Sequence, residues 1–200
     1  MKNTKVIIGL AICAVLAIVL GKVLLDSKDS SAPAANTQLT EVAELHEEYP
    51  DLGEDHNFER QPASVVASTF REGTGAIFLG FKECPWCQKL APLVNEAAEA
   101  AGQKVYYLDI RQARENNTTE YQELISILSP HLPKDESGQP RIYVPDFSIV
   151  KNGEIIWRHE NESVTDSEKT PDTYWTEERQ RRAVDRITQQ LNNLNEEAIQ

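Results

Sequence analysis

The chain has 200 residues, enough for one domain with its own hydrophobic core in addition to a short terminal segment. It carries 32 Asp and Glu against 20 Lys and Arg, and all of the acidic residues, with 17 of the basic ones, follow Leu25. That part therefore has a net charge of about −15, which argues against nucleic acid and against an anionic lipid surface as partners.

The first 25 residues differ in composition from the rest. A basic head, Met1 to Lys5, precedes an uncharged run, and with Lys22 near its end the span Val6–Leu25 can cross a bilayer as a helix. The lysines on the short side predict that the amino terminus stays inside. We therefore expect residues 1–25 to be a single-pass anchor in the cell membrane, with the C-terminal domain outside the cytoplasm.

Two alternatives for this segment would also export the domain. A cleaved signal peptide would use Ala32-Pro33-Ala34 as its cleavage site, although the charges between residues 26 and 29 make a poor approach to it. A lipoprotein would be modified at Cys13, but that residue lies in the middle of the span and follows the bulky Ile12. The anchor is the interpretation that we favour.

Residues 26–61 are predicted to be a linker. Residues 26 to about 38 are small, polar and rich in Pro, Ala and Ser, a composition typical of a flexible tether. Leu39–Tyr49 has room for a short amphipathic helix, and Pro50–Pro62 is expected to be loop. The ordered domain is then expected over residues 62–200.

The first half of that domain alternates between helix and strand. We expect, in order, a helix over Ala63–Glu72, a buried strand over Ala76–Phe81, a helix up to Ala101, a strand over Val105–Ile110, and a helix from Asn117 to Leu128, opened by the capping pattern of Asn117 and Glu120. The first strand–helix–strand unit must be a right-handed parallel crossover.

The second half predicts a hairpin and a last helix. Residues 129–140 are loop, and strands over Asp146–Val150 and Glu154–His159 are joined by Asn152-Gly153, a strong hairpin signal. A helix from about Tyr174 would carry one apolar stripe of Val184, Ile187, Leu191 and Leu194. The fold class is therefore α/β, with a central mixed sheet flanked by helices.

The chemistry-bearing motif is Cys84-Pro85-Trp86-Cys87, between the first strand and its helix. Cys84 would lie at the helix amino terminus, where unpaired N–H groups and the helix dipole lower a thiol pKa. Cys84 is thus the expected nucleophile, and the more buried Cys87 the resolving thiol. Pro85 suits the first helical position, and Trp86 is expected on the exposed rim, as an apolar contact for substrate.

A zinc site is the competing interpretation of two cysteines at this spacing. Structural zinc normally needs four ligands, with a second pair at short spacing. The remaining candidates are scattered along the chain, at His46, His56, His131 and His159. We therefore favour redox chemistry, and no metal, flavin or nucleotide cofactor is implied.

Three features together resemble the thioredoxin superfamily over about residues 62–195. They are the strand that leads into the cysteine motif, Pro92 five residues after Cys87, and Val144-Pro145 before a strand that ends in Lys151-Asn152-Gly153-Glu154. The resemblance implies a thioredoxin-like fold with the order βαβαββα. It also implies that Pro145 is cis beside the sulfurs and that the Val144 backbone pairs with substrate.

More narrowly, the anchor and the Val-Pro-Asp-Phe stretch are similar to bacteriocin-transport accessory proteins of Gram-positive bacteria. The chain also departs from thioredoxin. Phe78 stands where thioredoxins hold a buried aspartate thought to help deprotonate the second thiol. Glu83 precedes Cys84 in place of the usual tryptophan, and its charge would oppose thiolate formation unless Lys82 offsets it.

The resulting hypothesis is a bacterial thiol–disulfide oxidoreductase that exchanges disulfides in exported proteins. Cys84 and Cys87 are its catalytic residues, and Trp86, Val144 and Pro145 contact substrate. A redox partner must recharge the pair, and the sequence does not decide between reductase and oxidase. The alternative is a non-catalytic binding or chaperone module that uses the same groove as an accessory to secretion.

Overall fold

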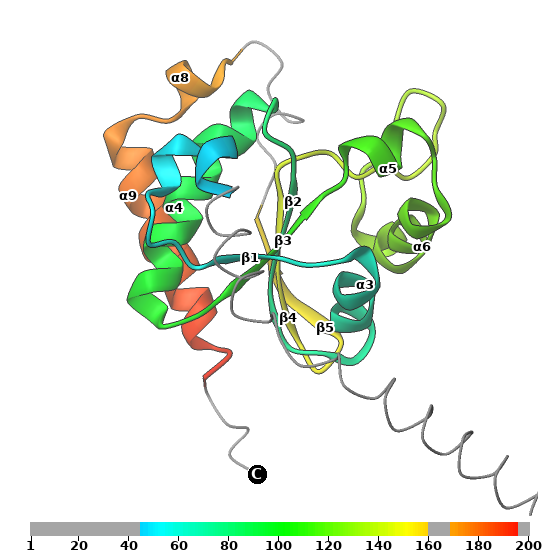
Figure 1. Cartoon of the computed structure of the whole chain (residues 1–200), viewed down its shortest axis with the longest axis horizontal. Helices are drawn as coiled ribbons and strands as arrows, with labels where there is room; N and C mark the ends of the chain where they lie inside the picture. Colours follow the sequence, from blue (N-terminus) through cyan, green and yellow to red (C-terminus); the bar gives the residue numbers. More distant parts are fainter. Residues whose placement is uncertain (1–44, 160–168, 196–200) are drawn as a thin grey trace, which may run out of the picture. The chain divides into compact units, whose positions relative to one another are not determined.

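The computed structural model describes residues 45–159 and 169–195, so the expected anchor over 1–25 lies outside the described residues. Within these ranges the chain has a mixed α/β architecture with one five-stranded sheet (Figure 1). After a helical turn at 45–48, the elements are η1 (Pro50–Leu52), β1 (Phe58–Arg60), α3 (Ala63–Glu72), β2 (Gly75–Gly80), α4 (Pro85–Ala101), β3 (Val105–Asp109), α5 (Arg111–Glu115), α6 (Thr119–Leu128), η2 (Ser129–His131), β4 (Asp146–Lys151), β5 (Glu154–Arg158), α8 (Pro171–Tyr174) and α9 (Glu177–Asn192).

The part of the chain that the structure describes contains no helix that is both long and apolar enough to cross a membrane.

The sheet has the strand order β1-β3-β2-β4-β5. β1 and β2 run parallel to β3, while β4 is antiparallel to β2 and β5 is antiparallel to β4. The expected parallel crossover from β2 through α4 to β3, and the expected hairpin of β4 and β5, are therefore both present. The last residues of β2 and the first residues of β4 lie side by side at the same end of the sheet, since Leu79 pairs with Asp146.

Helices cover both faces of the sheet. α3 and α6 lie on one side, and α4 and α9 lie on the other (Figure 1). The central strands are buried on both faces, because consecutive residues of β2 and β4 are buried, including the polar Asp146 and Ser148 of β4. Aromatic rings of neighbouring strands pack in edge-on or tilted contacts, with Phe78 contacting Phe58, Tyr107 and Phe147 at centroid distances of 5.4, 6.2 and 6.5 Å.

The expected loop over Pro50–Pro62 differs from the structure, because it contains η1 and β1. β1 extends the sheet by pairing Phe58 with Val105 of β3. The residues before it join the same core, with Leu45, Tyr49 and Leu52 buried. The sheet therefore begins before residue 62, and part of the stretch expected to be linker packs beside the cysteine motif.

The turn between β4 and β5 has the expected conformation. Asn152 and Gly153 both have positive φ angles, of 53° and 78°, as the two central residues of a type I′ turn require. Gly153 also packs tightly: a Cβ there would lie 2.1 Å from the carbonyl oxygen of Arg71. This contact fixes the hairpin against the end of α3.

Two helix starts differ from expectation. α6 begins at Thr119, where the side chain of Thr118 accepts a hydrogen bond from the Tyr121 N–H, and the expected cap Asn117 has a positive φ angle. The last helix is split into α8 and α9, because Thr176 caps a new start at Glu177. Along α9, Ile187 and Leu191 of the expected stripe are buried.

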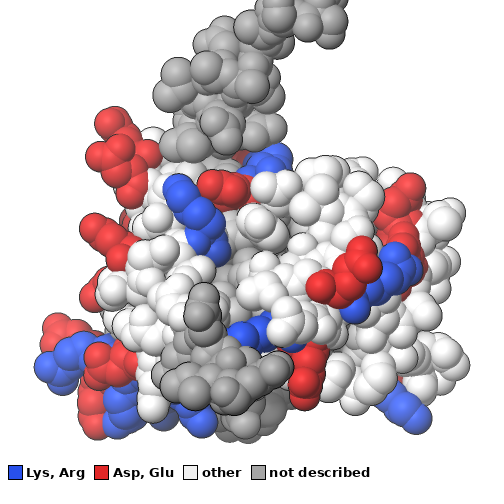
Figure 2. Space-filling model, turned by 90° about the horizontal axis from the view of Figure 1, so that it is seen from below, with Lys and Arg blue, Asp and Glu red and all other residues white. Residues whose placement is uncertain are grey.

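The surface carries charges of both signs. On the face shown in Figure 2, acidic and basic side chains alternate with uncharged areas. The acidic side chains on that face are therefore not gathered into one patch, although the chain has a net charge of −12.

Candidate active site

Cys84 is the N-cap residue of α4, in the short connection that follows the end of β2 at Gly80. It has extended backbone angles, and Pro85 takes the first helical position as expected. The Cys87 N–H donates to the Cys84 sulfur at 3.1 Å, so the sulfur takes the place of the side-chain oxygen that usually caps a helix. Both cysteines are buried free thiols, with 6% of Cys84 and none of Cys87 exposed. Pro92 lies inside the same helix.

The two thiols have opposite electrostatic surroundings. A hydrogen bond from the Cys87 thiol is the largest cause that lowers the pKa of Cys84. The N–H groups of Cys87 and Trp86 and the charge of Arg114 also lower this pKa, against the opposing effect of burial. Burial, then the hydrogen bond and charge of Cys84, raises the pKa of Cys87 well above its usual value. These surroundings therefore favour ionisation of Cys84 over ionisation of Cys87.

Val144 and Pro145 complete the sulfur site. The Val144–Pro145 peptide bond is cis, as the resemblance implies. The protonated Cys84 thiol donates to the Val144 carbonyl, with 3.7 Å between sulfur and oxygen. The chain thus brings together Cys84, Cys87, Val144 and Pro145, although 56 residues lie between the motif and Val144.

No protein-family model and no curated protein matches this chain.

The charge of Glu83, expected to oppose the thiolate, is compensated by a residue of another element. Arg111, the first residue of α5, forms an ion pair with Glu83 at 2.7 Å and also pairs with Glu115. The hydrogen bond from Arg111 is the largest cause that lowers the pKa of Glu83, and Lys82 makes a smaller contribution. A guanidinium therefore balances the carboxylate next to Cys84.

Phe78 is fully buried in the aromatic core, so the position at which thioredoxins hold a buried aspartate carries no carboxyl group here. The sulfur of Cys87 faces Gly80 instead, where an added Cβ would lie 3.3 Å from it. Gly80 pairs with Asp109 at the end of β3. Burial is the main cause that raises the pKa of Asp109, while the Arg111 N–H donates to its carboxylate at 2.8 Å. Asp109 is thus the carboxyl that the sheet places beside Cys87.

A pair of tyrosines lies in the same region. Their hydroxyl groups are 3.2 Å apart in the buried bond between Tyr49 and Tyr107. Burial is the main cause that raises the pKa of both, and the charges of Cys87 and Cys84 contribute to the shift of Tyr49. Sequence reasoning missed these residues and Asp109. The only available signal was that Tyr49 ends a stretch with amphipathic character.

Trp86 was expected on the exposed rim, but it is half-buried. Its ring lies 5.6 Å from that of Tyr174 in α8. An ion pair of 2.9 Å between Lys89 and Asp172 also joins α4 to α8. The C-terminal part of the domain therefore covers one side of the motif, as the position of α8 in Figure 1 also shows.

The scattered histidines were the alternative ligands of a zinc site. Within residues 45–159 and 169–195, no three His, Cys, Asp or Glu side chains lie close enough to hold a metal ion.

Proposed function

We propose that this chain is a thiol–disulfide oxidoreductase with a thioredoxin-like fold. The observation that carries the proposal is the sulfur of Cys84 at the start of α4, in contact with the Cys87 N–H and with the Val144 carbonyl before a cis proline. The lowered pKa of Cys84 and the raised pKa of Cys87 support a division of roles between the two thiols.

In the reducing direction, the Cys84 thiolate attacks one sulfur of a substrate disulfide. The substrate S–S bond breaks, a mixed disulfide with Cys84 forms, and the leaving thiolate takes a proton. Cys87 then loses its proton and attacks the Cys84 sulfur, which releases the second substrate thiol. Two electrons pass to the substrate, and Cys84 and Cys87 become a disulfide.

The oxidising direction uses the same residues in reverse. Reduction potentials of about −120 mV are typical of oxidants, and those of about −270 mV are typical of reductants. Equilibration of the protein with glutathione buffers, followed by thiol counting, gives this potential. It therefore identifies the direction and the kind of redox partner that must recharge the pair.

We further propose that the substrates are exported proteins and that residues 1–25 hold the domain at the outer side of the cell membrane. This part of the proposal rests on the basic head and the apolar span Val6–Leu25. Protease treatment of intact cells and of lysed cells tests it, because only an external domain is digested in intact cells.

The test of the chemistry is the turnover of insulin disulfides. Wild type should reduce them in the presence of a recycling reductant, and Cys84→Ser should have no activity above background. Cys13→Ser is the matched control, since it removes a thiol outside the motif, and it should keep full activity. If Cys84→Ser were as active as wild type, the enzyme proposal would be wrong, and retained peptide binding would favour a non-catalytic module.

A further inference from the structure

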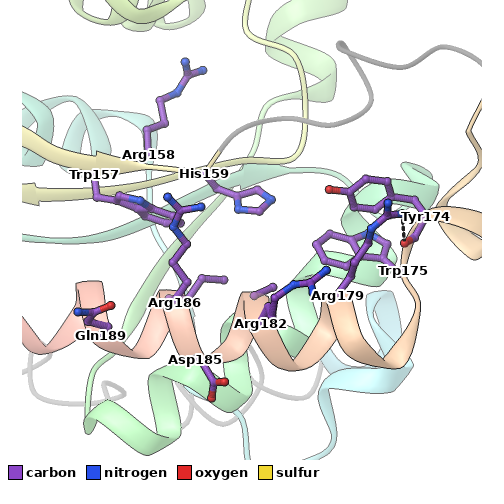
Figure 3. Close-up of a pocket in the computed structure, with 12 residues that line it drawn as sticks. Trp157, Arg158, His159, Tyr174, Trp175, Arg179, Arg182, Asp185, Arg186 and Gln189 are labelled. Atoms are coloured by element: carbon purple, nitrogen blue, oxygen red, sulfur yellow. Dashed lines mark hydrogen bonds between the residues drawn. The ribbon is translucent and has the colours of Figure 1, made fainter.

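A groove of about 540 Å³ lies between the end of β5, α8 and one face of α9. This volume is within the usual range for ligand-binding cavities. Figure 3 shows Arg179, Arg182 and Arg186 rising from α9 toward the groove. Asp185 is the one acidic residue of the lining, and in this view its carboxylate points away from the three guanidinium groups. Because the arginines are three and four residues apart, they lie on one face of α9.

The positive charge of this groove is only partly balanced. Arg186 forms no ion pair with any of the residues that the structure describes. Arg182 pairs with Glu178 on the exposed surface, and such pairs contribute little. Arg179 lies over the ring of Tyr174 at 4.5 Å and donates to its carbonyl at 2.9 Å. Three guanidinium groups of α9 thus line one groove in a chain of net charge −12, and a fourth lining arginine, Arg158, pairs with Asp146.

The opposite wall is aromatic. His159 stacks on Trp175 with an interplanar angle of 18°, and it also contacts the ring of Trp157. The indole N–H of Trp175 has no hydrogen-bond acceptor among the described residues, although only 7% of Trp175 is exposed. A buried donor without an acceptor costs free energy.

The groove begins beside the cysteine motif. Tyr174, at its end, contacts Trp86 of the motif. The His159 N–H donates to the carbonyl of Phe147 at 2.8 Å, and Phe147 lies two residues after Pro145. The end of β5 is therefore next to the beginning of β4. A polypeptide held at Cys84 therefore has the arginines within reach of its neighbouring residues.

We propose that this groove binds acidic side chains of the substrate polypeptide, close to the disulfide that reacts with Cys84. The proposal deepens the proposed function and rests on it. Guanidinium groups bind carboxylates with paired, charge-assisted hydrogen bonds. The aromatic wall excludes water from one side and so strengthens the attraction. The substrate class is accordingly a disulfide flanked by Asp or Glu.

The first test compares three reporter peptides that share one disulfide and differ only in flanking residues: Glu, Gln or Lys. Wild type should turn over the Glu peptide with a kcat/KM about tenfold above that of the Gln peptide, mainly through KM, and the Lys peptide should be the slowest. The double substitution Arg182→Gln, Arg186→Gln should reduce the Glu-to-Gln ratio to about one. Equal rates for all three peptides with wild type would overturn the proposal.

Arg181→Gln is the matched control, because Arg181 belongs to the same helix but does not line the groove. It should leave the tenfold preference in place. If it abolished the preference as completely as the double substitution, the effect would come from the overall charge of α9, and the groove would not be the site.

A binding measurement separates this inference from the enzyme proposal. A Glu-rich peptide without cysteine is titrated into the Cys84→Ser, Cys87→Ser protein, followed by tryptophan fluorescence. Binding that the Arg182→Gln, Arg186→Gln substitutions abolish supports the groove even if no disulfide is turned over. No binding, or binding only to phosphatidylglycerol vesicles, would overturn the groove inference even if insulin is reduced.

Discussion

Two sulfur atoms three residues apart have different surroundings, and this difference supports the proposed division of roles between them. Cys84 receives an N–H at the start of α4, whereas Cys87 is fully buried against Gly80. Burial penalises an anion that has no compensating donors, and backbone donors favour one that has them. The first thiol of the motif is thus suited to attack a disulfide, and the second is suited to remain protonated until a mixed disulfide has formed.

The lowered pKa of Cys84 predicts selective alkylation. With iodoacetamide at neutral pH, reduced protein should be modified at Cys84 at least about tenfold faster than at Cys87, because only the thiolate reacts. Mass spectrometry of peptides taken at short times measures both rates. Similar rates at the two sites would contradict the assignment of nucleophile and resolving thiol.

Asp109 predicts an effect on the ionisation of Cys87. Its charge is one of the causes that raise the pKa of Cys87. Asp109→Asn removes the charge and keeps an oxygen that can accept from the Arg111 N–H. In a Cys84→Ser background, alkylation of Cys87 at pH 8 should become about two- to fivefold faster. Asp135→Asn, in a distant surface loop, should leave the rate unchanged.

At the scale of elements, the main addition to the sequence interpretation is the packed segment before residue 62. β1 has three residues with one apolar side chain, Phe58, so no alternation marks it as a strand. Its stability comes from tertiary contacts, because the ring of Phe58 contacts the rings of both Phe78 and Tyr107. Only the tertiary structure shows such an element.

This packing predicts a large stability effect from a residue in the expected linker. Phe58→Ala should lower the free energy of unfolding by about 3–5 kcal/mol, because it leaves a cavity in a core position that is 1% exposed. Urea unfolding measures the loss. Glu59→Ala on the same strand should change stability by less than about 0.5 kcal/mol. Equal effects would show that β1 does not belong to the folded core.

Most elements that position the motif were predictable from the sequence. β2, α4, β3 and the β4–β5 hairpin follow from an apolar run, a helix start and an Asn-Gly turn, all of which are local signals. The arginine groove was not predictable, because Arg179, Arg182 and Arg186 lie on the polar side of a helix and resemble ordinary surface charges. Their meaning depends on Trp157 and Trp175, which only the fold places opposite them.

For the whole molecule, the two thiols make the stability of the reduced form depend on pH. The folded pKa of Cys84 is lowered, so its contribution is lost as pH falls through that value and is complete above the unfolded value of about 8.5. The folded pKa of Cys87 is raised, so its contribution is complete below about 8.5 and is lost as pH rises further. The combined contribution of the two thiols to the stability of the reduced protein should therefore be greatest near pH 8.5.

This maximum is measured against the Cys84→Ser, Cys87→Ser variant, which lacks both titrations. The free energy of unfolding of reduced wild type, relative to the variant, should rise from pH 6 to about 8.5 and then decline. Urea titrations under reducing conditions at several pH values provide the comparison. A difference that does not change with pH would show that neither thiol is perturbed by folding.

The strand order also bears on how the molecule behaves in a crowded environment. The two outer strands, β1 and β5, have three and five residues, and each carries charged side chains such as Arg60 and Glu154. Short, charged edge strands are poor templates for β-strand pairing between molecules. Many copies at high concentration would accordingly resist fibril-like aggregation.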